Sequence, residues 1–178
     1  ALMRDTALME LIRDAGKSTD TQVGKVEGAR IAQLLKGKIP VVYASGLHFP
    51  LAYIWKIKLN ETAKIPAFCN VVPELCHNEL SGFDIAESTR DISRQLSVLF
   101  FRSSEDHPRI QTRMKVASDV LIEKGIPCED IWLTETGFKK AFATALLVDW
   151  VSMYLAQDYG VPNLETPLIT SFKHRIKQ

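Results

Sequence analysis

The sequence has little cysteine, no excess of either charge and no long apolar run. Its three cysteines, Cys69, Cys76 and Cys128, are an odd number without the spacing of a disulfide framework, which favours reduced thiols and a cytoplasmic location. The 22 basic and 21 acidic residues leave a net charge of +1, whereas nucleic acids and membranes attract strongly basic surfaces. No apolar segment is long enough to span a bilayer. We therefore expect no nucleic-acid partner and no membrane partner.

The sequence also lacks clusters of metal ligands, internal repeats and low-complexity linkers. No set of histidines and cysteines has the spacing of a metal site, so we expect no bound metal. What is present is an ordinary globular composition, with 178 residues of which 46% are hydrophobic and 24% are charged. This length and composition predict one domain, residues 1–178, with a full-sized core.

Short apolar runs alternate with longer helical patterns. The strands are expected at 39–44, 65–72, 96–102 and 130–134, and the main helices at 2–14, 23–35, 51–60, 108–124, 138–159 and 164–178. Strands that are apolar throughout and are separated by helices of about ten residues or more are typical of parallel βαβ units. The sequence therefore predicts an α/β fold, a three-layer α/β/α sandwich around a mainly parallel sheet of four or five strands.

The pattern also suggests which residues are structural. The helix at 138–159 is almost wholly apolar in its middle, which predicts deep burial or a subunit contact. All three tryptophans lie on apolar segments and are interpreted as core residues. Residues 106–109 are interpreted as a turn that leads into a helix, with a structural or subunit-contact role for His107 and Arg109.

Polar residues follow each expected strand, at 45–48, 72–77, 102–109 and 134–136. In open parallel sheets, ligands bind beyond the carboxyl ends of the strands. The backbone amides of Ser45 and Gly46 could bind an anion there, but we favour a simple turn at this position.

The segment 60–80 concentrates groups that suit acid–base chemistry. Glu61 ends an apolar helix just before an expected strand, and His77 follows that strand, between Glu74 and Glu79. A carboxylate is a suitable general base, and a histidine changes charge near neutral pH. From the residues alone, a solvated Glu61 is the favoured alternative, and pairing of His77 with its glutamate neighbours is as well supported as catalysis. Glu74 is interpreted as structural, orienting a backbone group or His77.

Several motifs together carry a family resemblance: AYIWK, the NE at 60–61, PELCHNE and DHPRI. Their joint occurrence resembles the carboxyl-terminal half of bifunctional phosphoglucose/phosphomannose isomerases, which belong to the sugar isomerase (SIS) domain superfamily. The similarity continues through VDWVSMYLA and into LETPLITSFKHRI, so it covers nearly the whole chain. The resemblance implies an SIS-like domain with a parallel sheet.

The resemblance also implies a cofactor-free isomerase of carbohydrate metabolism, in glycolysis and gluconeogenesis. Such an enzyme interconverts fructose 6-phosphate with glucose 6-phosphate and mannose 6-phosphate by proton transfer through a cis-enediol. The resemblance puts the catalytic base at Glu61 and a ring-opening histidine at His77, which enters the partner's site in a homodimer. Lys173 matches a catalytic lysine of the family, and Thr166 matches a threonine that binds the sugar.

One part of the family's site is missing from this sequence. In the family, the phosphate-binding Ser/Thr loops and an active-site arginine belong to an amino-terminal SIS domain. We therefore expect residues 1–178 to be the carboxyl-terminal half of a two-domain enzyme, with little isomerase activity alone. The alternative is a non-catalytic SIS module that binds a phosphosugar or only dimerises.

Overall fold

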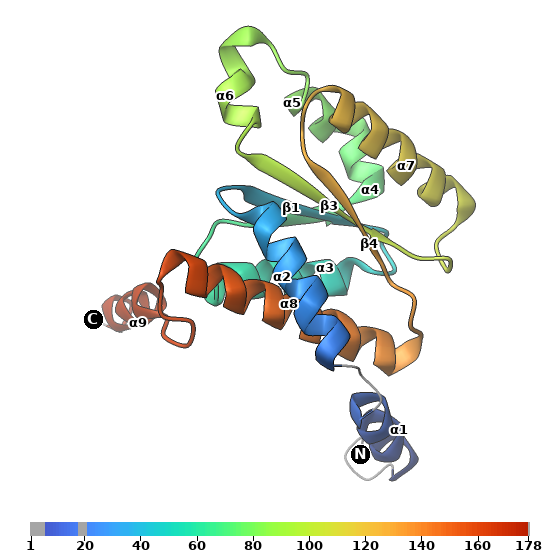
Figure 1. The fold of residues 1–178 in the computed structure, drawn as a ribbon, viewed down its shortest axis with the longest axis vertical. Coiled ribbons are helices and arrows are strands. Elements are labelled where there is room, and N and C mark those ends of the chain that lie inside the picture. The colour runs from blue at the N-terminus through green and yellow to red at the C-terminus, as the bar shows by residue number, and fades with distance from the viewer. Residues whose placement is uncertain (1–5, 18–20, 178) are drawn as a thin grey trace.

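A computed structural model describes residues 6–17 and 21–177, and its centre is a sheet of four strands (Figure 1). They are β1 (Ile39–Ala44), β2 (Phe68–Val71), β3 (Leu96–Arg102) and β4 (Cys128–Trp132), in the order β2-β1-β3-β4. All neighbouring pairs are parallel. The predicted α/β fold is confirmed, and β1 and β3 occupy the expected residues.

The other two strands differ from their predicted bounds. β2 is shorter than 65–72 because Pro66 has no N–H for the ladder and Pro73 opens a helix. β4 begins and ends two residues earlier than predicted, since Cys128 pairs with Val98 of β3 and Trp132 pairs with Arg102. The apolar pattern of the sequence therefore located the strands, but hydrogen-bonded pairing with the neighbouring strand determined where β4 begins and ends.

Helices cover both faces of the sheet (Figure 1). On one face lie α2 (Thr21–Leu35), α3 (Phe49–Glu61) and α8 (Gly137–Tyr159). On the other lie α7 (Pro108–Glu123) and the short segments after β2, which are α4 (Val72–Glu74), a π-helical turn (Leu75–Glu79) and α5 (Leu80–Gly82). The region before β3, expected to be irregular, holds a 3₁₀ turn (Glu87–Thr89) and α6 (Arg90–Ser93).

β3 shows how one strand supplies two cores, because successive side chains of a strand point to opposite faces. Leu99 and Phe101 pack into the cluster formed with α2, α3 and α8, whereas Val98 and Phe100 pack into the cluster on the α7 side. All four side chains are fully buried. Burial of each such side chain contributes roughly 1.5–3 kcal/mol, so the sheet is held from both sides.

One side of α8 packs against α2 and α3, and the opposite side is exposed. It packs so closely on α2 that a Cβ added to Gly28 would lie 2.5 Å from the Cβ of Trp150. Phe142 and Met153 of the same helix are exposed. The expected burial therefore holds for the face toward α2 and α3.

The tryptophan prediction is right for one residue and wrong for another. Trp55 is fully buried, with its ring packed edge-on against Phe101, and Trp150 is half-buried. Trp132 is 60% exposed, because it is the last residue of an edge strand. His107 has the predicted structural role, since its Nδ1 accepts a hydrogen bond from the backbone N–H of Arg109 at the start of α7.

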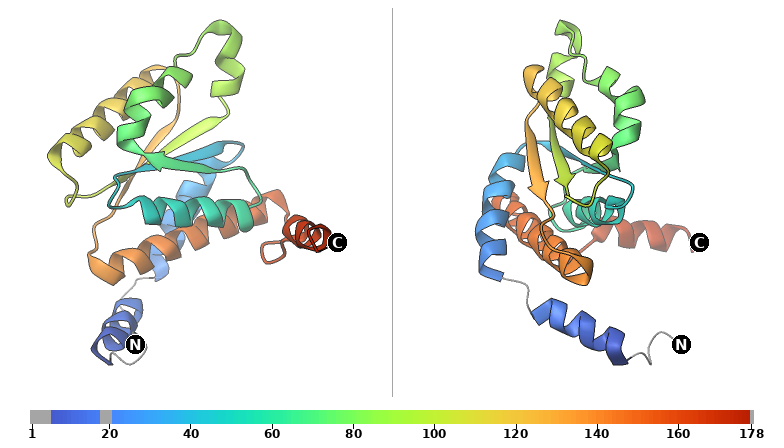
Figure 2. Two further views of the ribbon diagram at one scale, coloured as in Figure 1. Left: turned by 180° about the vertical axis from the view of Figure 1, so that it is seen from behind. Right: turned by 90° about the vertical axis from the view of Figure 1, so that its right-hand side faces the viewer.

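The two terminal helices lie at the outside of the sandwich (Figure 2). α1 (Thr6–Lys17) contacts α8, and the first residues of the helix predicted at 2–14 lie outside the described residues. α9 (Pro167–Arg175) has no buried residue, and its Leu168 and Phe172 are exposed. No helix within 6–17 and 21–177 is long and apolar enough to cross a membrane.

Candidate functional site

The two edges of the sheet carry different polar groups. We call the edge where the parallel strands end the carboxyl edge, and the edge where they begin the amino edge. α3 and α8 start at the carboxyl edge and run back along the sheet (Figure 1), so Glu61 and Tyr159 at their ends lie at the amino edge. The predicted base therefore lies away from the strand-end loops at which we expected a ligand.

A cavity of about 410 Å³ opens at the amino edge, between the end of α3 and the segment that joins α8 to α9. Two of the predicted site residues, Glu61 and Thr166, both line it. Much of the remaining wall is apolar and includes Val161, Pro162 and Ile169. The fold thus brings a carboxylate and a hydroxyl residue from distant parts of the chain to one cavity, which we call the Glu61 cavity.

The turn after α3 is held by two interactions that position Glu61. The side-chain oxygen of Asn60 accepts a hydrogen bond from the backbone N–H of Ala67 at 2.8 Å. Lys64 has a φ of 58°, which is uncommon for a residue other than glycine, and its ammonium group donates to the backbone oxygen of Glu61. Lys64 also lines the cavity, so the cavity holds a cation as well as a carboxylate.

Glu61 is exposed, in agreement with the solvated carboxylate that the residues alone favour. It is the last residue of α3, so its side chain extends past the buried turn that contains Leu59. Its carboxylate has no hydrogen-bond partner in the part of the chain that the structure describes. A free carboxylate beside apolar walls is able to accept a proton from a molecule bound there.

Thr166 and Lys173 lie on the same short helical segment but in different surroundings. Thr166 is half-buried immediately before α9, where its backbone oxygen accepts the Thr170 N–H at 3.0 Å. Its hydroxyl makes no capping hydrogen bond, so it remains available to a ligand. Lys173 is exposed on α9 and does not line the Glu61 cavity.

His77 lies in the π-helical turn after β2, at the carboxyl edge. Glu79 anchors this turn, because one of its carboxylate oxygens accepts a hydrogen bond from the Tyr43 hydroxyl and the other accepts one from the Asn70 amide, both at 2.6 Å. Burial, and then the contact with Glu79, raises the pKa of Tyr43 well above its ordinary value, so the hydroxyl stays protonated and donates. π-helical turns are rare overall, but those that occur are often found at functional sites.

The structure does not support the interpretation in which His77 pairs with its glutamate neighbours. Glu79 is bonded by Tyr43 and Asn70, and Glu74 accepts a hydrogen bond from the side chain of Asn78 and not from His77. His77 is exposed, and within the described ranges its side chain has no hydrogen bond or ion pair. The imidazole is therefore free to meet another molecule.

Glu61 and His77 lie on opposite sides of β2, one before the strand begins and the other after it ends. A single chain does not bring these two side chains into one site. A shared site would require His77 of a second copy, which is the arrangement that the family resemblance implies.

The sequence reasoning missed a buried polar cluster at the carboxyl edge. His48, Asp106 and Lys140 are only 3%, 5% and 6% exposed, which is unusual for ionisable groups. His48 Nδ1 lies 3.0 Å from Asp106 Oδ1, and His48 Nε2 lies 3.1 Å from Lys140 Nζ. Lys140 also donates to Glu105 at 2.7 Å, and this hydrogen bond lowers the pKa of Glu105.

The geometry of this cluster determines the tautomer of His48. An ammonium group only donates, so Nε2 accepts from Lys140 and the Nδ1–H donates to Asp106. Ser45 Oγ lies 3.2 Å from the same Nδ1, so the loop after β1 is part of a polar cluster and not a simple turn. The cluster ties together the loop after β1, the loop after β3 and the start of α8. The signal in the sequence was that His48 and Asp106 each follow a strand.

Metal and thiol chemistry have no obvious centre in the described residues. There, no group of three or more His, Cys, Asp and Glu side chains could hold a metal ion. Cys69, Cys76 and Cys128 are free thiols, each partly buried against one of the two cores. This agrees with their interpretation as packing residues.

Comparison with solved structures defines the class of this domain. A glucose-6-phosphate isomerase like protein from Thermus thermophilus superposes with a TM-score of 0.59 at 17% identity, covering 78% of this chain and 45% of that chain. The C-terminal domain of glucosamine-fructose-6-phosphate aminotransferase from Francisella tularensis gives a TM-score of 0.63 at 14% identity, covering 90% and 46%. These superpositions show the class of fold, an α/β/α sandwich around a parallel sheet.

The sequence assigns the family. A profile of the family described as bacterial phospho-glucose isomerase C-terminal SIS domain matches residues 25–176, and the chain belongs to this family. The resemblance inferred from the motifs is thereby confirmed.

The curated relatives are longer proteins. Bifunctional phosphoglucose/phosphomannose isomerases from Aquifex aeolicus and Caldicellulosiruptor bescii are 31% and 34% identical over 157 and 134 residues. These alignments cover 86% and 73% of this chain but 47% and 38% of the relatives. D-glucosamine-6-phosphate 4-epimerase from Sulfolobus acidocaldarius is 49% identical over 63 residues, covering 35% of this chain and 20% of the relative. The chain thus spans about half the length, or less, of the curated relatives it matches.

Proposed function

We propose that this chain is the carboxyl-terminal half of a sugar-phosphate isomerase that interconverts fructose 6-phosphate with glucose 6-phosphate and mannose 6-phosphate. The observation that carries the proposal is that Glu61 and Thr166, matched to the family by motif, line one cavity. Membership of the phospho-glucose isomerase family and the bifunctional relatives support the reaction class.

Glu61 is the proposed base. Isomerisation moves a proton between C1 and C2 of the open sugar, and the C–H bond beside a carbonyl is a weak acid that needs a positioned acceptor. General-base catalysis contributes about 10²–10⁴-fold. The Glu61 carboxylate has no partner in the described chain, so it is free to take this proton and return it to the neighbouring carbon of the cis-enediol. The apolar walls would exclude water once the cavity is closed.

Thr166 and Lys173 have supporting roles in this proposal. The Thr166 hydroxyl binds the sugar on the side of O2, and it is small enough to leave room for either configuration at C2. The Lys173 ammonium stabilises the oxyanion that develops as the proton leaves. Because Lys173 does not line the Glu61 cavity in the single chain, this role requires α9 to close over the bound sugar.

His77 serves the site of a second subunit in this proposal. It is exposed, unpaired within the described chain and displayed on a turn that Glu79 holds in place. A histidine changes charge near neutral pH and can move the proton that opens the sugar ring. The expected assembly is therefore a homodimer in which each active site uses Glu61 from one protomer and His77 from its partner.

The proposal includes a second SIS domain and a cytoplasmic setting. The Glu61 cavity contains Lys64 but no serine-rich loop for the phosphate among the described residues, so the amino-terminal domain of the longer enzyme is expected to bind that group. Free thiols at all three cysteines agree with the cytoplasm. The isolated chain is expected to have little isomerase activity.

The test is an assay of fructose 6-phosphate turnover by the two-domain protein and by its Glu61→Gln variant. We expect the variant to lose about 10²–10⁴-fold in kcat while it still binds the sugar. Glu74→Gln, which changes an exposed carboxylate near His77, is the matched control and should keep most of the activity. Full activity in Glu61→Gln would overturn the base assignment.

The non-catalytic SIS module remains the second candidate, because Glu61 is exposed in this chain and lies far from its own His77. A folded two-domain protein that binds fructose 6-phosphate without turnover would favour it. Glucosamine 6-phosphate should be assayed in parallel, since one relative is an epimerase of that sugar.

A further inference from the structure

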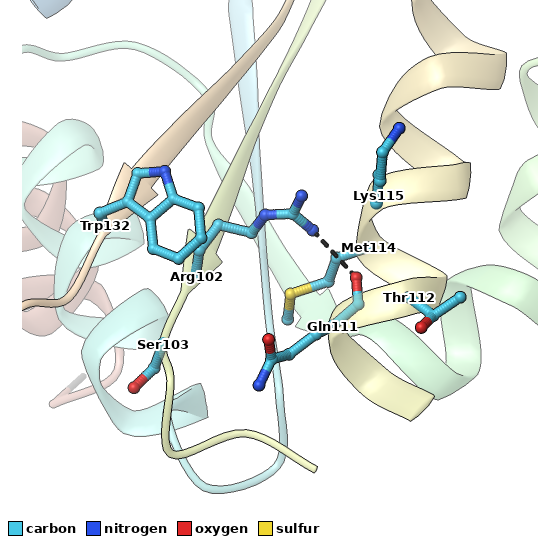
Figure 3. Close-up of a pocket in the computed structure, with 7 residues that line it drawn as sticks. All are labelled: Arg102, Ser103, Gln111, Thr112, Met114, Lys115 and Trp132. Carbon is cyan, nitrogen blue, oxygen red and sulfur yellow. Dashed lines mark hydrogen bonds between the residues drawn. The ribbon is translucent and has the colours of Figure 1, made fainter. Parts of the chain in front are cut away.

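A second cavity, of about 390 Å³, lies at the carboxyl edge between the ends of β3 and β4 and the first turns of α7 (Figure 3). It shares no lining residue with the Glu61 cavity. Its volume falls within the range of small-molecule pockets, about 300–1,000 Å³. Open parallel sheets bind ligands at this edge, so the cavity is placed where a ligand is expected.

Arg102 is the main charged group of this cavity. Its side chain is only 11% exposed and extends from the end of β3 toward α7 (Figure 3). Nε donates to Asp130 Oδ2 at 3.1 Å, and Nη1 donates to the backbone oxygen of Gln111 at 3.4 Å. A guanidinium has five N–H groups in a planar fork, so three of them have no partner in the described chain. Such a fork fits the oxygens of a phosphate or a carboxylate.

Lys115 supplies a second cation on α7. Its ammonium pairs with Asp119 at 2.7 Å, and the two side chains are 68% and 52% exposed. An exposed pair of this kind contributes little free energy, so Lys115 can turn toward a ligand at small cost. None of the described residues that line the cavity is acidic, and the electrostatic field inside it therefore favours an anion.

The uncharged side of the cavity suits a flat ring. Trp132 is 60% exposed, and its ring centroid lies 5.9 Å from Arg102 Cζ. Figure 3 shows Trp132 and the Met114 thioether flanking the Arg102 side chain. An indole face stacks on other aromatic rings, whereas Met114 is fully buried in the core on the α7 side.

The geometry points to a binding site for a small organic anion with an aromatic ring, of which a nucleoside monophosphate is an example. The ring lies against the exposed Trp132, and the anionic group accepts hydrogen bonds from the unused N–H groups of Arg102 and from Lys115. Binding involves no covalent step. It is independent of the isomerase proposed above, since the two cavities lie at opposite edges of the sheet.

The first experiment is isothermal titration calorimetry of the 178-residue chain at low ionic strength with AMP, adenosine and inorganic phosphate. We expect AMP to bind with a dissociation constant below about 1 mM, and each of the two halves to bind at least about tenfold more weakly. No binding of AMP at millimolar concentration overturns the proposal. If adenosine binds as tightly as AMP, the anionic group is not recognised and that part of the proposal is wrong. If phosphate binds as tightly as AMP, the aromatic ring is not recognised and that part is wrong.

Two variants with matched controls locate the site. Trp132→Ala should weaken AMP binding about tenfold through loss of stacking, whereas Phe172→Ala, which removes a 61% exposed ring from α9, should not. Lys115→Ala should weaken binding a few-fold at low salt and less at high salt. Its control is Lys124→Ala, which breaks a similar 2.7 Å surface pair at the other end of α7. Equal effects of variant and control place the ligand elsewhere and overturn the proposal.

A third variant tests Arg102 by a gain of affinity. Asp130→Asn keeps the shape of the side chain but removes the charge that compensates Arg102. We expect AMP to bind several-fold more tightly, because the fork is then a stronger anion site. Misfolding cannot produce a gain, and circular dichroism checks the fold. Unchanged or weaker binding by the folded variant contradicts the role of Arg102.

Discussion

The buried His48 cluster at the carboxyl edge and the Glu61 cavity at the amino edge place their ionisable groups in opposite surroundings. At the carboxyl edge, His48, Asp106 and Lys140 are buried, and the imidazole of His48 is hydrogen-bonded to the other two. At the amino edge, Glu61 is exposed at a cavity, and its carboxylate has no partner in the described residues. The difference separates groups that stabilise the fold from groups that are available for chemistry.

The physical basis is the free energy of desolvation. A buried charge is tolerated only when it is paired and hydrogen-bonded, and removal of one partner leaves the other uncompensated. An exposed carboxylate is solvated in the free protein and loses water only when a ligand or another subunit covers it. The same residue types are therefore structural in the buried His48 cluster and accessible to a ligand at the Glu61 cavity.

The largest effect is expected at Glu61, and it should be confined to activity. Glu61→Gln should reduce kcat of the two-domain protein by about 10²–10⁴-fold, while the free energy of unfolding changes by less than about 0.5 kcal/mol. Turnover assays and urea denaturation of the same sample measure both quantities. A marked loss of stability would show that Glu61 belongs with the structural groups.

The buried cluster should behave in the reverse way. Asp106→Ala leaves the buried His48 without its carboxylate partner, and we expect a loss of about 3–5 kcal/mol in the free energy of unfolding. The exposed carboxylate of Asp119, paired with Lys115 on the surface, is the control, and its removal should cost less than about 1 kcal/mol. Urea denaturation compares them. Similar losses for both variants would remove the distinction between the two edges.

Tyr43→Phe should have an intermediate effect. It removes the hydroxyl that donates to Glu79 at 2.6 Å and should cost about 1–3 kcal/mol, since the half-buried carboxylate loses one donor. If the turn presents His77, the two-domain enzyme should also lose activity. Asn70→Ala, which removes the other donor to Glu79, should have the same effect. Normal stability and activity in both variants would contradict the anchoring role.

The smallest expected effect is on the stability of the fold at low pH. The pKa of Glu105 is lowered by its hydrogen bond to Lys140, so the folded state is favoured when this carboxylate is ionised. The contribution of Glu105 to the free energy of unfolding is complete at pH values above 4.5, the ordinary pKa of a glutamate. It is lost as the pH falls through the lowered pKa of Glu105 in the folded state. Glu105→Gln should lower the melting temperature slightly at neutral pH and not in strong acid, by scanning calorimetry. A difference that persists unchanged in acid would exclude this linkage.

Much of the fold could be predicted because its signals are local. The run Ile39–Ala44 and the run Leu96–Arg102 are apolar almost throughout and matched their strands to the residue. Trp132 was misassigned for the same reason, since its neighbours Ile131 and Leu133 are apolar and buried. Its position at the end of an edge strand is not visible in a local pattern.

The candidate site was predictable only in part. Motif resemblance selected Glu61, His77, Thr166 and Lys173, but it could not say which of them share a cavity. The His48 cluster was overlooked because each member, taken alone, resembles an ordinary loop or helix-start residue.

The sequence by itself determined the parallel sandwich and the family, because continuous apolar strands between amphipathic helices have few stable arrangements and because the motifs are specific. Only the tertiary structure decided that Glu61 and Thr166 line one cavity and that Arg102 lies beside an exposed Trp132. Such contacts depend on where each helix returns along the sheet, and the residues that meet there are far apart in the chain.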